Sequence, residues 1–398
     1  MHNRDSIQNI LKKALGNIHK KRIESLIEMA SSLLNGGSLT VSSLGRNLSG
    51  EALEKSRIHR ADSIIGNGLL RREHLLISKT LVDHFFQQRE TLYVLIDGSG
   101  CCSDERFIIQ ASIANAGLGR SQPIHSIVYA KDRGAHVDAQ DRLLKDLQFI
   151  FMGFKGRIVL ITDAGFYSTW FNKVREIGWS YVGRVRGRVK IKRNGFKRWE
   201  SVQDIYVEAT NKAVCLSKAI VGRDNKARST GTLYLIKKNK KGRKKPLSQK
   251  RYPQEERQYE QMYRDPWLLV SSLDNEDPKS IIAMYALRMQ IEQNFRDIKS
   301  SQYGFGLEES GTKDLMRLSN LLLVATIAIF MAFILGLCAE KNALYKTFQA
   351  NTIKIRRILS LVYLGKRVWR TALSKITDFI QQTVDDFLSW NGGDIQNA

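Results

Sequence analysis

The run from Leu318 to Ala339, LSNLLLVATIAIFMAFILGLCA, contains no charged residue, and it restricts the fold more than any other stretch of the sequence. As a helix it is long enough to cross a bilayer, whose hydrocarbon core takes about 20 apolar residues. The alternative is a helix that protein surrounds on all sides in a large α/β domain. Because the rest of the chain is polar and basic residues flank the run on both sides, we expect the buried helix and no membrane anchor.

Charge gives the second constraint. The 398 residues carry a formal net charge of +24. Self-repulsion of this size favours binding to a polyanion, with nucleic acid as the first candidate and an acidic membrane surface as the second. The hydrophobic fraction of 43% indicates a globular chain rather than a disordered one. Its length is that of two or three domains.

Cysteine usage indicates a reduced compartment. Cys101, Cys102, Cys215 and Cys338 have neither zinc-site nor redox spacing, and they suggest no framework of disulfides. The polar N-terminal stretch MHNRDSIQNILKK lacks the apolar segment of a signal peptide. We therefore expect a cytoplasmic protein.

Residues 1–75 are expected to form a helical N-terminal domain. LKKALGNIHKKRIESLIEMASSLL places apolar residues at helical spacing, and short helical pieces with turn signals at Gly45 and Gly50 follow it. The basic residues Arg57 and Arg60 in this second part favour a small helix-turn-helix-like unit that binds a DNA end. The alternative is a plain helical bundle whose arginines are solvated.

The middle of the chain is rich in strand signals. Strands are expected at 91–97, in ERFIIQASIAN, in IHSIVYA, at 156–163 and in WSYVGRV, with a helix in STWFNKVREIG. This mixture predicts an α/β domain whose first part covers 76–189. Asp97 and Asp163 end two of the strands, and α/β domains tend to build their sites at the carboxyl ends of strands.

Residues 190–264 are expected to form a β-rich basic insertion. RVRGRVKIKRNGFKR alternates basic with apolar residues, as a strand with one charged face does, and 237–251 are nearly all basic residues and turn formers. This second stretch is either a solvated loop or an arm that contacts the DNA backbone. DPWLLVSSL then predicts a strand that returns to the main sheet, within a second catalytic part at 265–345. Residues 346–398 predict a helical C-terminal region.

A narrow polar stripe follows that strand. The residues DP at 277–278 provide a helix N-cap and a first-turn proline, and we expect an uninterrupted helix up to Lys299. At about 100° per residue, Tyr285, Arg288, Glu292 and Lys299 fall inside a sector of about 60°. An ordinary surface helix spreads its charges over a broader face, so this alignment suggests a shared task.

Glu292 and the strand-end aspartates Asp97 and Asp163 make a set of three carboxylates. Mg²⁺ is held by a few carboxylates together with substrate phosphate oxygens. Two such ions activate an attacking hydroxyl and stabilise the leaving oxygen of a phosphoryl transfer. The set therefore predicts a catalytic site with two Mg²⁺ ions, with Mn²⁺ as the other candidate. The structural alternative is that Glu292 only pairs with Arg288 or Arg296 at helical spacing.

The spacing Y-x2-R-x3-E-x6-K resembles the signature of bacterial DDE transposases of the insertion-sequence-four type. LIDGS at Asp97, TDAGF at Asp163, LGRNL near the N-terminus, RVRG at 184–187 and RMQIEQNFRDIKS resemble further motifs of this family, especially of its Tn-ten type members. The likeness covers nearly the whole chain in order. It implies a ribonuclease-H-like catalytic core with a β-rich insertion, flanked by helical N-terminal and C-terminal domains.

The resemblance implies cut-and-paste transposition of double-stranded DNA. Water nicks the element's end, and the freed 3′-OH attacks the opposite strand and forms a hairpin. Water then reopens the hairpin, and the 3′-OH attacks target DNA, so that every step is a phosphoryl transfer. A homodimer would hold the two inverted-repeat ends in one synaptic complex on the bacterial nucleoid. The helices of 346–398 are the candidate for the dimer contact.

The resemblance also implies roles for residues around the three carboxylates. Arg288, Lys299 and Tyr285 would hold the terminal phosphates, the arginine through its fork and the lysine as a point charge. Trp267 would stack an extruded base, and its alternative is a core tryptophan. Met289 stands where other members have a second stacking tryptophan, and a thioether cannot stack as a ring does.

Arg184 and Arg186, in the motif RVRG, complete the expected DNA contacts together with Arg57 and Arg60. Two alternatives to a transposase stay open. One is a different ribonuclease-H-like nuclease, which would cleave DNA without a hairpin or strand transfer. The other is a catalytically retired, transposase-derived DNA-binding protein, which would need a broken carboxylate set.

Overall fold

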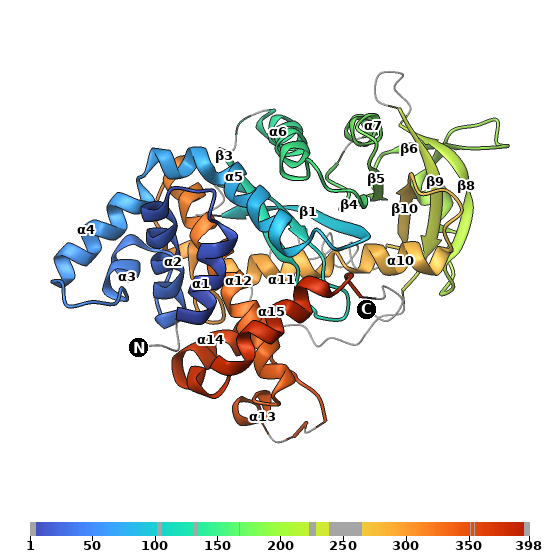
Figure 1. The fold of residues 1–398 in the computed structure, drawn as a ribbon. Coiled ribbons are helices and arrows are strands. Elements are labelled where there is room, and N and C mark those ends of the chain that lie inside the picture. The colour runs from blue at the N-terminus through green and yellow to red at the C-terminus, as the bar shows by residue number, and fades with distance from the viewer. Residues whose placement is uncertain are drawn as a thin grey trace, which may run out of the picture. The chain divides into compact units, whose positions relative to one another are not determined.

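In the computed structural model the apolar run forms α12 (Leu315–Lys341), which lies inside the protein (Figure 1). Its most apolar 18-residue window has a mean hydropathy of 2.8, enough to cross a membrane by length and composition, and all of that window is buried. The helix packs against α2 (Lys20–Asn35), α5 (Gly68–Phe85) and α14 (Leu361–Thr371). It is therefore packed as a core helix, as the buried-helix interpretation expects.

Two glycines let α14 lie very close to α12. A Cβ atom at Gly365 would overlap the carbonyl oxygen of Ala332, and one at Gly336 would overlap the carbonyl oxygen of Leu361. Only a residue without a Cβ allows two helix backbones to approach so closely. The C-terminal helix is thus part of the packing around the central helix.

The structure describes residues 5–101, 106–130, 132, 134–166, 168–222, 228–238, 265–350, 352–353 and 355–393. The chain divides into two units. The first combines Met1–Ile158 with Leu287–Ala398, and the second is Val159–Ala286. The first unit is therefore built from two stretches that are far apart in the sequence. The five predicted domain segments stay predictions.

Helices form the N-terminal part of the first unit, as expected for 1–75. Their bounds, apart from those of α2 and α5, are α1 (Asp5–Ala14), α3 (Val41–Arg46) and α4 (Glu54–Ile65). The short α3 packs tightly on α4, because a Cβ at Gly45 would lie only 2.4 Å from the Cα of Ile58. Two short helices in such contact suit a helix-turn-helix-like unit, and its role in DNA binding stays a prediction.

Three antiparallel strands form the sheet of the first unit, in the order β3-β2-β1. Their bounds are β1 (Thr91–Cys101), β2 (Arg106–Ile113) and β3 (Gln122–Ala130). The prediction that the first strand ends at Asp97 is wrong. Asp97 pairs with Gln110 in the middle of β1, and the ladder continues until Cys101 pairs with Arg106. The glycine-rich segment after Asp97 stays extended because β2 supplies backbone partners for it.

The helix α6 (Ala135–Ile150) has no counterpart among the predicted elements. It packs on β3 and α5. Its buried residues include Ala139, Leu143, Leu147 and Ile150, which recur at helical spacing. The same periodicity is present in AHVDAQDRLLKDLQFI and would have predicted this helix.

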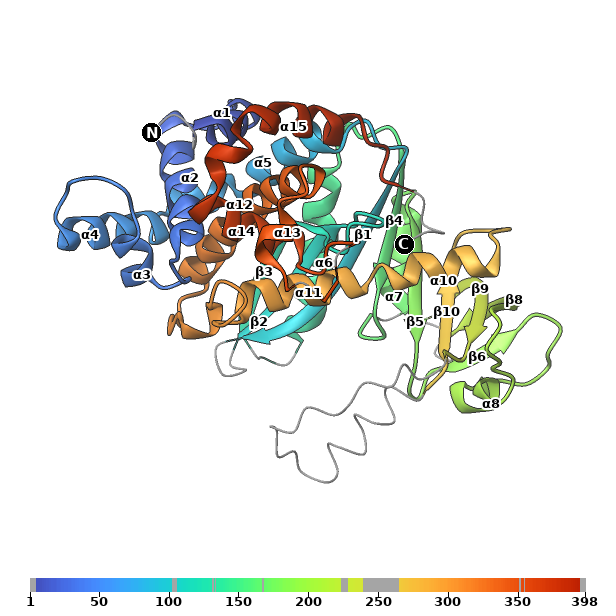
Figure 2. The ribbon, with the colours of Figure 1, turned by 90° about the horizontal axis from the view of Figure 1, so that it is seen from below.

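The second unit is built on strands in the order β4-β5-β10-β9-β8-β6-β7. β4 and β5 are parallel, and the other pairs are antiparallel (Figure 2). The helix α10 packs on β5 and β9. The bounds are β4 (Arg157–Thr162), α7 (Ser168–Glu176), β5 (Ser180–Val185), β6 (Lys190–Arg193), β7 (Glu200–Ser201), α8 (Val202–Tyr206), β8 (Val214–Val221), β9 (Ser229–Ile236), β10 (Trp267–Ser271) and α10 (Pro278–Ala286).

Most of the expected strands are confirmed in this unit. The segments 156–163, WSYVGRV and DPWLLVSSL form β4, β5 and β10, and β10 pairs with β5 as a strand returning to the sheet would. The expected insertion at 190–264 contains β6 to β9. From residue 239 on, the basic run at 237–251 lies outside the described residues.

The charged face expected for the basic strand is wrong at Arg193. In β6 the burial alternates so that Ile191 and Arg193 are both buried. Arg193 is accommodated there because its guanidinium donates to both oxygens of Glu200 and to both oxygens of Glu208, at 2.6–2.9 Å. Burial of an arginine leaves no unpaired charge when its guanidinium is hydrogen-bonded to carboxylates, so it does not destabilise the fold in that way.

The expected uninterrupted helix up to Lys299 is also wrong. It is divided into α10, which ends at Ala286, and α11 (Met289–Lys299). Between the two helices, backbone hydrogen bonds join residues that are three positions apart. The N–H of Gln290 donates to the carbonyl of Leu287, and the N–H of Ile291 donates to the carbonyl of Arg288. These i to i+3 bonds replace the i to i+4 bonds of an α-helix.

The remaining helices belong to the first unit, and they confirm that 346–398 is largely helical. They are α13 (Tyr345–Phe348), α14 and α15 (Ile380–Ser389), with two short 3₁₀ turns between the last two. Strands and helices mix between β1 and β10, with helices before and after them, so the predicted α/β fold class is confirmed. Three antiparallel strands, a helix and the parallel pair β4 and β5 joined by α7 follow one another as in a ribonuclease-H-like core, and β6 to β9 come after them as a β-rich insertion.

Candidate active site

Asp97 projects from the middle of β1 and is held by two groups. Its Oδ1 accepts a hydrogen bond from the N–H of Gly98 at 2.8 Å, and its Oδ2 accepts one from Nη1 of Arg288 at 2.9 Å. The side chain is 18% exposed. A carboxylate in this position is partly shielded from water but still accessible to a ligand.

Glu292 lies in the first turn of α11 and contacts the same arginine. Its Oε1 accepts a hydrogen bond from Nη2 of Arg288 at 2.5 Å. The side chain of Glu292 is 38% exposed, while that of Arg288 is 11% exposed. The helical pair of Glu292 with Arg288, which was the structural alternative, is therefore present. The guanidinium also binds Asp97, so two predicted catalytic carboxylates meet on one cationic group.

Lys299, the last residue of α11, makes a second contact with β1, in addition to that of Arg288 with Asp97. Its ammonium donates a hydrogen bond to the carbonyl of Gly100 and lies 3.2 Å from Oε1 of Glu308. The side chain is 20% exposed. Arg288, at the N-cap of α11, and Lys299, at its end, thus mark two points, about three turns apart, at which this helix contacts the strand that carries Asp97.

The second unit holds the other members of the expected site. Asp163 directly follows β4, as predicted, and its Oδ1 accepts a hydrogen bond from the hydroxyl of Tyr285 at 3.2 Å. Tyr285 is 2% exposed, so it is a buried support of the aspartate. The half-buried Trp267 lies edge-on to the Tyr285 ring, with centroids 4.8 Å apart. The ammonium of Lys238 lies 3.7 Å from the centroid of Trp267.

The carboxylates suit a hard cation in their chemistry. Asp97 and Glu292 already direct one oxygen each at a single positive charge, and carboxylate oxygens are the ligands that Mg²⁺ prefers. Asp163 lies in the second unit, whereas the other two lie in the first. Across the described part of the chain, no three His, Cys, Asp or Glu side chains are gathered closely enough to hold a metal. The two-ion site stays a prediction.

The other residues that are expected to contact DNA lie on several different elements. Met289 is 41% exposed at the start of α11. Arg186 forms an ion pair with Asp265 at 3.2 Å, and the half-buried Arg184 lies in β5. In the N-terminal helices, Arg57 donates a hydrogen bond to the carbonyl of Leu48 at 2.8 Å. Their roles toward DNA stay predictions.

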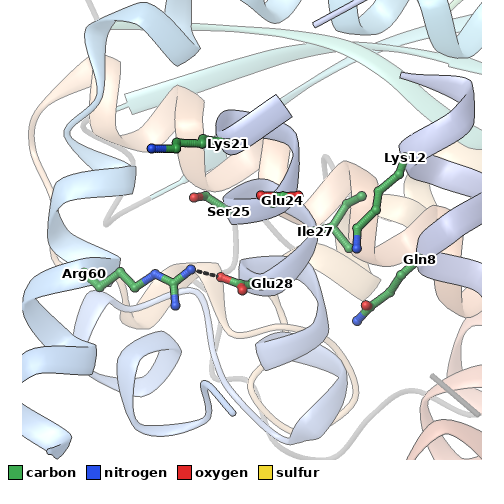
Figure 3. A pocket seen from close by; sticks show the side chains of 8 residues that line it. All are labelled: Gln8, Lys12, Lys21, Glu24, Ser25, Ile27, Glu28 and Arg60. Atoms are coloured by element: carbon green, nitrogen blue, oxygen red, sulfur yellow. Dashed lines mark hydrogen bonds and ion pairs between the residues drawn. The ribbon is translucent and has the colours of Figure 1, made fainter. Parts of the chain in front are cut away.

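Arg60 lies in the wall of a pocket among the N-terminal helices. The pocket has a volume of about 390 Å³, and Figure 3 shows that Arg60 is directed at Glu28, with which it forms an ion pair. The lining is mixed in charge, because it contains both basic and acidic side chains. The residues are Gln8, Lys12, Lys21, Glu24, Ser25, Ile27, Glu28 and Arg60. Arg60 is therefore partly engaged in holding α4 to α2.

The sequence analysis missed one group of residues on α11. Gln290, Asn294 and Asp297 are polar and buried, on the side of the helix away from Glu292. Their signal was a second polar stripe, spaced by four and three residues beside the first. Buried polar residues at helical spacing, on the face opposite the predicted catalytic Glu292, indicate a helix that is held at a defined rotation.

Comparisons with known proteins show what this chain is similar to. A model of the family "Transposase DDE domain" matches residues 109–331. No curated protein matches the chain. Among solved structures, the cryo-EM structure of a piggyBac transposase synaptic complex with hairpin DNA is 13% identical to it, over 93% of this chain and 76% of that one, with a TM-score of 0.42. The family match covers more than half of the 398 residues, and the chain therefore belongs to the transposase DDE domain family.

Proposed function

We propose that the chain is a cut-and-paste DNA transposase of the insertion-sequence-four family, close to the Tn-ten type. It would cleave transposon ends through a hairpin intermediate and transfer the 3′-OH to target DNA. The observation that carries the proposal is that Asp97 and Glu292 both bind the guanidinium of Arg288. The family match supports the same chemistry, since it is a transposase domain that the chain contains.

Asp97, Asp163 and Glu292 would hold two divalent ions, Mg²⁺ or Mn²⁺. Asp97 and Glu292 fit this task because both are partly exposed and both direct a carboxylate oxygen at the same guanidinium. When bound, such ions activate the attacking hydroxyl and stabilise the leaving oxygen. Tyr285 would keep the carboxylate of Asp163 oriented through its hydrogen bond.

Arg288 and Lys299 would bind the phosphates next to the scissile bond. A planar guanidinium presents two N–H groups to a phosphate as it does to a carboxylate, so a DNA phosphate would compete with the acids for Arg288. Lys299 is a point charge within reach of the same strand, β1. The positive charges neutralise the backbone where the two carboxylates would otherwise repel it.

Trp267 would stack the base that leaves the duplex when the hairpin forms. It is half-buried rather than fully buried, and its ring contacts Tyr285 and Lys238. Aromatic stacking of an unpaired base is worth about 1–3 kcal/mol. Met289 is exposed enough to wedge beside that base.

The expected partners are the inverted-repeat ends and the target DNA, with a homodimer forming the synaptic complex. Arg57, Arg60, Arg184 and Arg186 would contribute backbone contacts, and the net charge of +24 supports binding to DNA. We expect the protein to work in the bacterial cytoplasm, on the nucleoid.

The test uses DNA that carries the inverted repeats flanking the gene. This DNA is incubated with Mg²⁺ and wild-type protein, Glu292→Gln, or the control Glu309→Gln, which changes an exposed glutamate of the same unit. Wild type and control should produce a nick followed by a hairpin on a denaturing gel. Glu292→Gln should bind the same DNA and cleave it at least about 1,000-fold more slowly, equivalent to about 4 kcal/mol.

Other outcomes would replace the proposal. Cleavage without a hairpin or strand transfer would identify a different ribonuclease-H-like nuclease. Binding without cleavage by the wild type would identify a DNA-binding descendant of a transposase. Cleavage that survives Glu292→Gln would show that the carboxylates at Arg288 are not the active site.

A further inference from the structure

The buried polar stripe of α11 lies opposite the catalytic one. Gln290, Asn294 and Asp297 are 7%, 0% and 6% exposed. At about 100° per residue they lie about 140–200° around the helix from Glu292. Helices normally turn apolar residues toward the core, because a buried polar group destabilises the fold unless it has hydrogen-bond partners.

Gln290 finds its partners in the loop of residues 114–121, which connects β2 to β3. Its Oε1 accepts from the N–H of Asn115 at 3.0 Å, and its Nε2 donates to the carbonyl of Asn115 at 2.9 Å. The side-chain amide therefore satisfies both backbone groups of one loop residue. Such a two-bond contact fixes direction as well as distance.

The other two residues of the stripe bind the end of the same loop. Nδ2 of Asn294 donates to the hydroxyl of Ser121 at 2.6 Å. Oδ2 of Asp297 accepts from Nε of Arg120 at 2.7 Å, in an ion pair whose side chains are 8% and 15% exposed. Three successive positions on one helix face are thus attached to one loop.

The loop is itself fixed in place. Asn115 donates through Nδ2 to the carbonyl of Arg120 at 3.0 Å, which closes the loop. Its Oδ1 accepts from Nη2 of the buried Arg89 at 2.7 Å. The Arg89 guanidinium lies 4.6 Å from the Phe86 ring centroid and 4.8 Å from that of Trp390. Asn115 is therefore held by a rigid, buried surrounding rather than by solvent.

The loop also connects to the strand that carries Asp97. It follows β2 directly, β2 pairs with β1 at Asp97, and the N–H of Ala114 donates to the carbonyl of Tyr93 in β1 at 2.8 Å. The loop therefore links the position of α11 to that of β1.

We propose that Gln290 is a positioning residue, and that its bonds to Asn115 set the rotation of α11 at which Glu292 and Arg288 face Asp97. The inference rests on the proposed function of that site. A rotation of about 20° moves a side chain that lies about 5 Å from the helix axis by about 2 Å. A misplacement of about 1 Å at a reacting centre costs about 100-fold in rate.

The test compares Gln290→Met with Gln293→Met, which makes the same change at a half-exposed position of the same helix. Methionine keeps the length and helix propensity of glutamine but forms neither bond to Asn115. Single-turnover nicking of end DNA should be about 100-fold slower for Gln290→Met, with the dissociation constant for DNA within about threefold of wild type. Gln293→Met should match wild type in both.

Nicking by Gln290→Met at the wild-type rate, or a loss of DNA affinity as large as the loss of rate, would overturn the proposal. If Gln290→Met does not fold, Gln290→Leu removes the same two bonds to Asn115 with a smaller apolar side chain, and at least a tenfold slower nicking rate is expected. A wild-type rate for that variant would equally overturn it.

Hydrogen exchange provides a readout that does not depend on cleavage. Peptides that cover 289–299 should exchange faster in Gln290→Met than in wild type or Gln293→Met. If the wild type cleaves no DNA, the proposed function fails, and the exchange rates alone decide whether Gln290 holds the helix. Unchanged exchange would refute the positioning role.

Discussion

Each of the two units contains an arginine that lies between two acidic residues. The two clusters differ in how the carboxylates bind the guanidinium. In the first unit Arg288 lies between Asp97 and Glu292, and each acid gives it one oxygen. In the second unit Arg193 donates to both oxygens of Glu200 and both of Glu208. The residue types are alike, but in the second cluster each acid binds the guanidinium through both of its oxygens.

This difference separates a structural cluster from one that can exchange partners. The hydrogen bonds that Arg193 donates to Glu200 and Glu208 raise its pKa above the usual value, and its side chain is 7% exposed. Exposure of the acids does not separate the clusters, since Glu208 is 42% exposed against 18% for Asp97 and 38% for Glu292. The difference lies in the bonding, because Glu200 and Glu208 each hold Arg193 through both oxygens. Composition alone would not have told the two clusters apart.

The largest expected contrast is in catalysis. Arg288→Met should slow cleavage of end DNA about 100- to 1,000-fold, because it removes a preorganised charge at the reacting phosphate. Arg193→Met should leave the rate per folded molecule within about threefold of wild type. Single-turnover nicking assays on both variants measure the contrast, and equal rates would show that the two clusters do not differ in function.

The second contrast is in stability. Arg193→Met should lower the free energy of unfolding by about 3–5 kcal/mol, because it leaves the buried Glu200 without its partner. The exposed Arg198→Met is the control and should change it by less than about 0.5 kcal/mol. Urea-induced unfolding gives both values. A loss under about 1 kcal/mol for Arg193→Met would mean that the cluster is not structural.

The half-buried Lys366 provides a third case, because its hydrogen bond goes to a carbonyl instead of a carboxylate. Lys366 donates to the carbonyl of Gly304 at 2.7 Å, and burial lowers its pKa from 10.5 to about 8. Between pH 8 and 10.5 the unfolded chain holds the proton that the folded chain has lost. Raising the pH through this window therefore stabilises the fold, by about 3 kcal/mol in total.

Thermal unfolding of wild type and Lys366→Met at pH 7.5, 9 and 10 checks this expectation. The melting temperature of wild type should rise relative to that of the variant as the pH increases. A constant difference between the two proteins over this range would exclude a lowered pKa for Lys366.

The smallest expected effect concerns two tryptophans of the second unit. Trp170 is 2% exposed and belongs to the core, whereas Trp267 is half-buried. Trp267→Ala should slow hairpin formation about tenfold and leave the first nick unchanged, since a stacked base contributes about 1–3 kcal/mol. Trp267→Phe should retain most of the rate. Equal losses in both steps would exclude base stacking.

Elements set by local pattern could be predicted from the sequence. The apolar run became α12, and the expected strands became β2 to β5 and β10, because burial periodicity and strand propensity act over a few residues. The meeting of Asp97 and Glu292 followed from the spacing of the polar stripe and its likeness to a known signature.

What the sequence could not reveal depends on partners far along the chain. The burial of Arg193 depends on its hydrogen bond to Glu208, which lies fifteen positions further along the chain. β1 extends beyond Asp97 because β2 pairs with it. No glycine or proline near Leu287 and Arg288 indicates that the helix is interrupted there. The interruption is visible only in the hydrogen bonds of the backbone. The role of Gln290 was hidden because its partner lies 175 positions earlier.

The close contact of α12 with α14 has a consequence for how the protein is made. Ribosomes add about 5–20 residues per second, and domains fold as soon as their parts have emerged. The packing of the first unit includes the close contact of Gly365 with Ala332. This unit therefore cannot complete its fold until the segment after α12 has been synthesised. Until then an apolar helix able to span a membrane stays uncovered in the nascent chain. Chains that stop before α14 should aggregate or be degraded, so that only completed copies acquire the fold that holds Asp97 and Glu292 together.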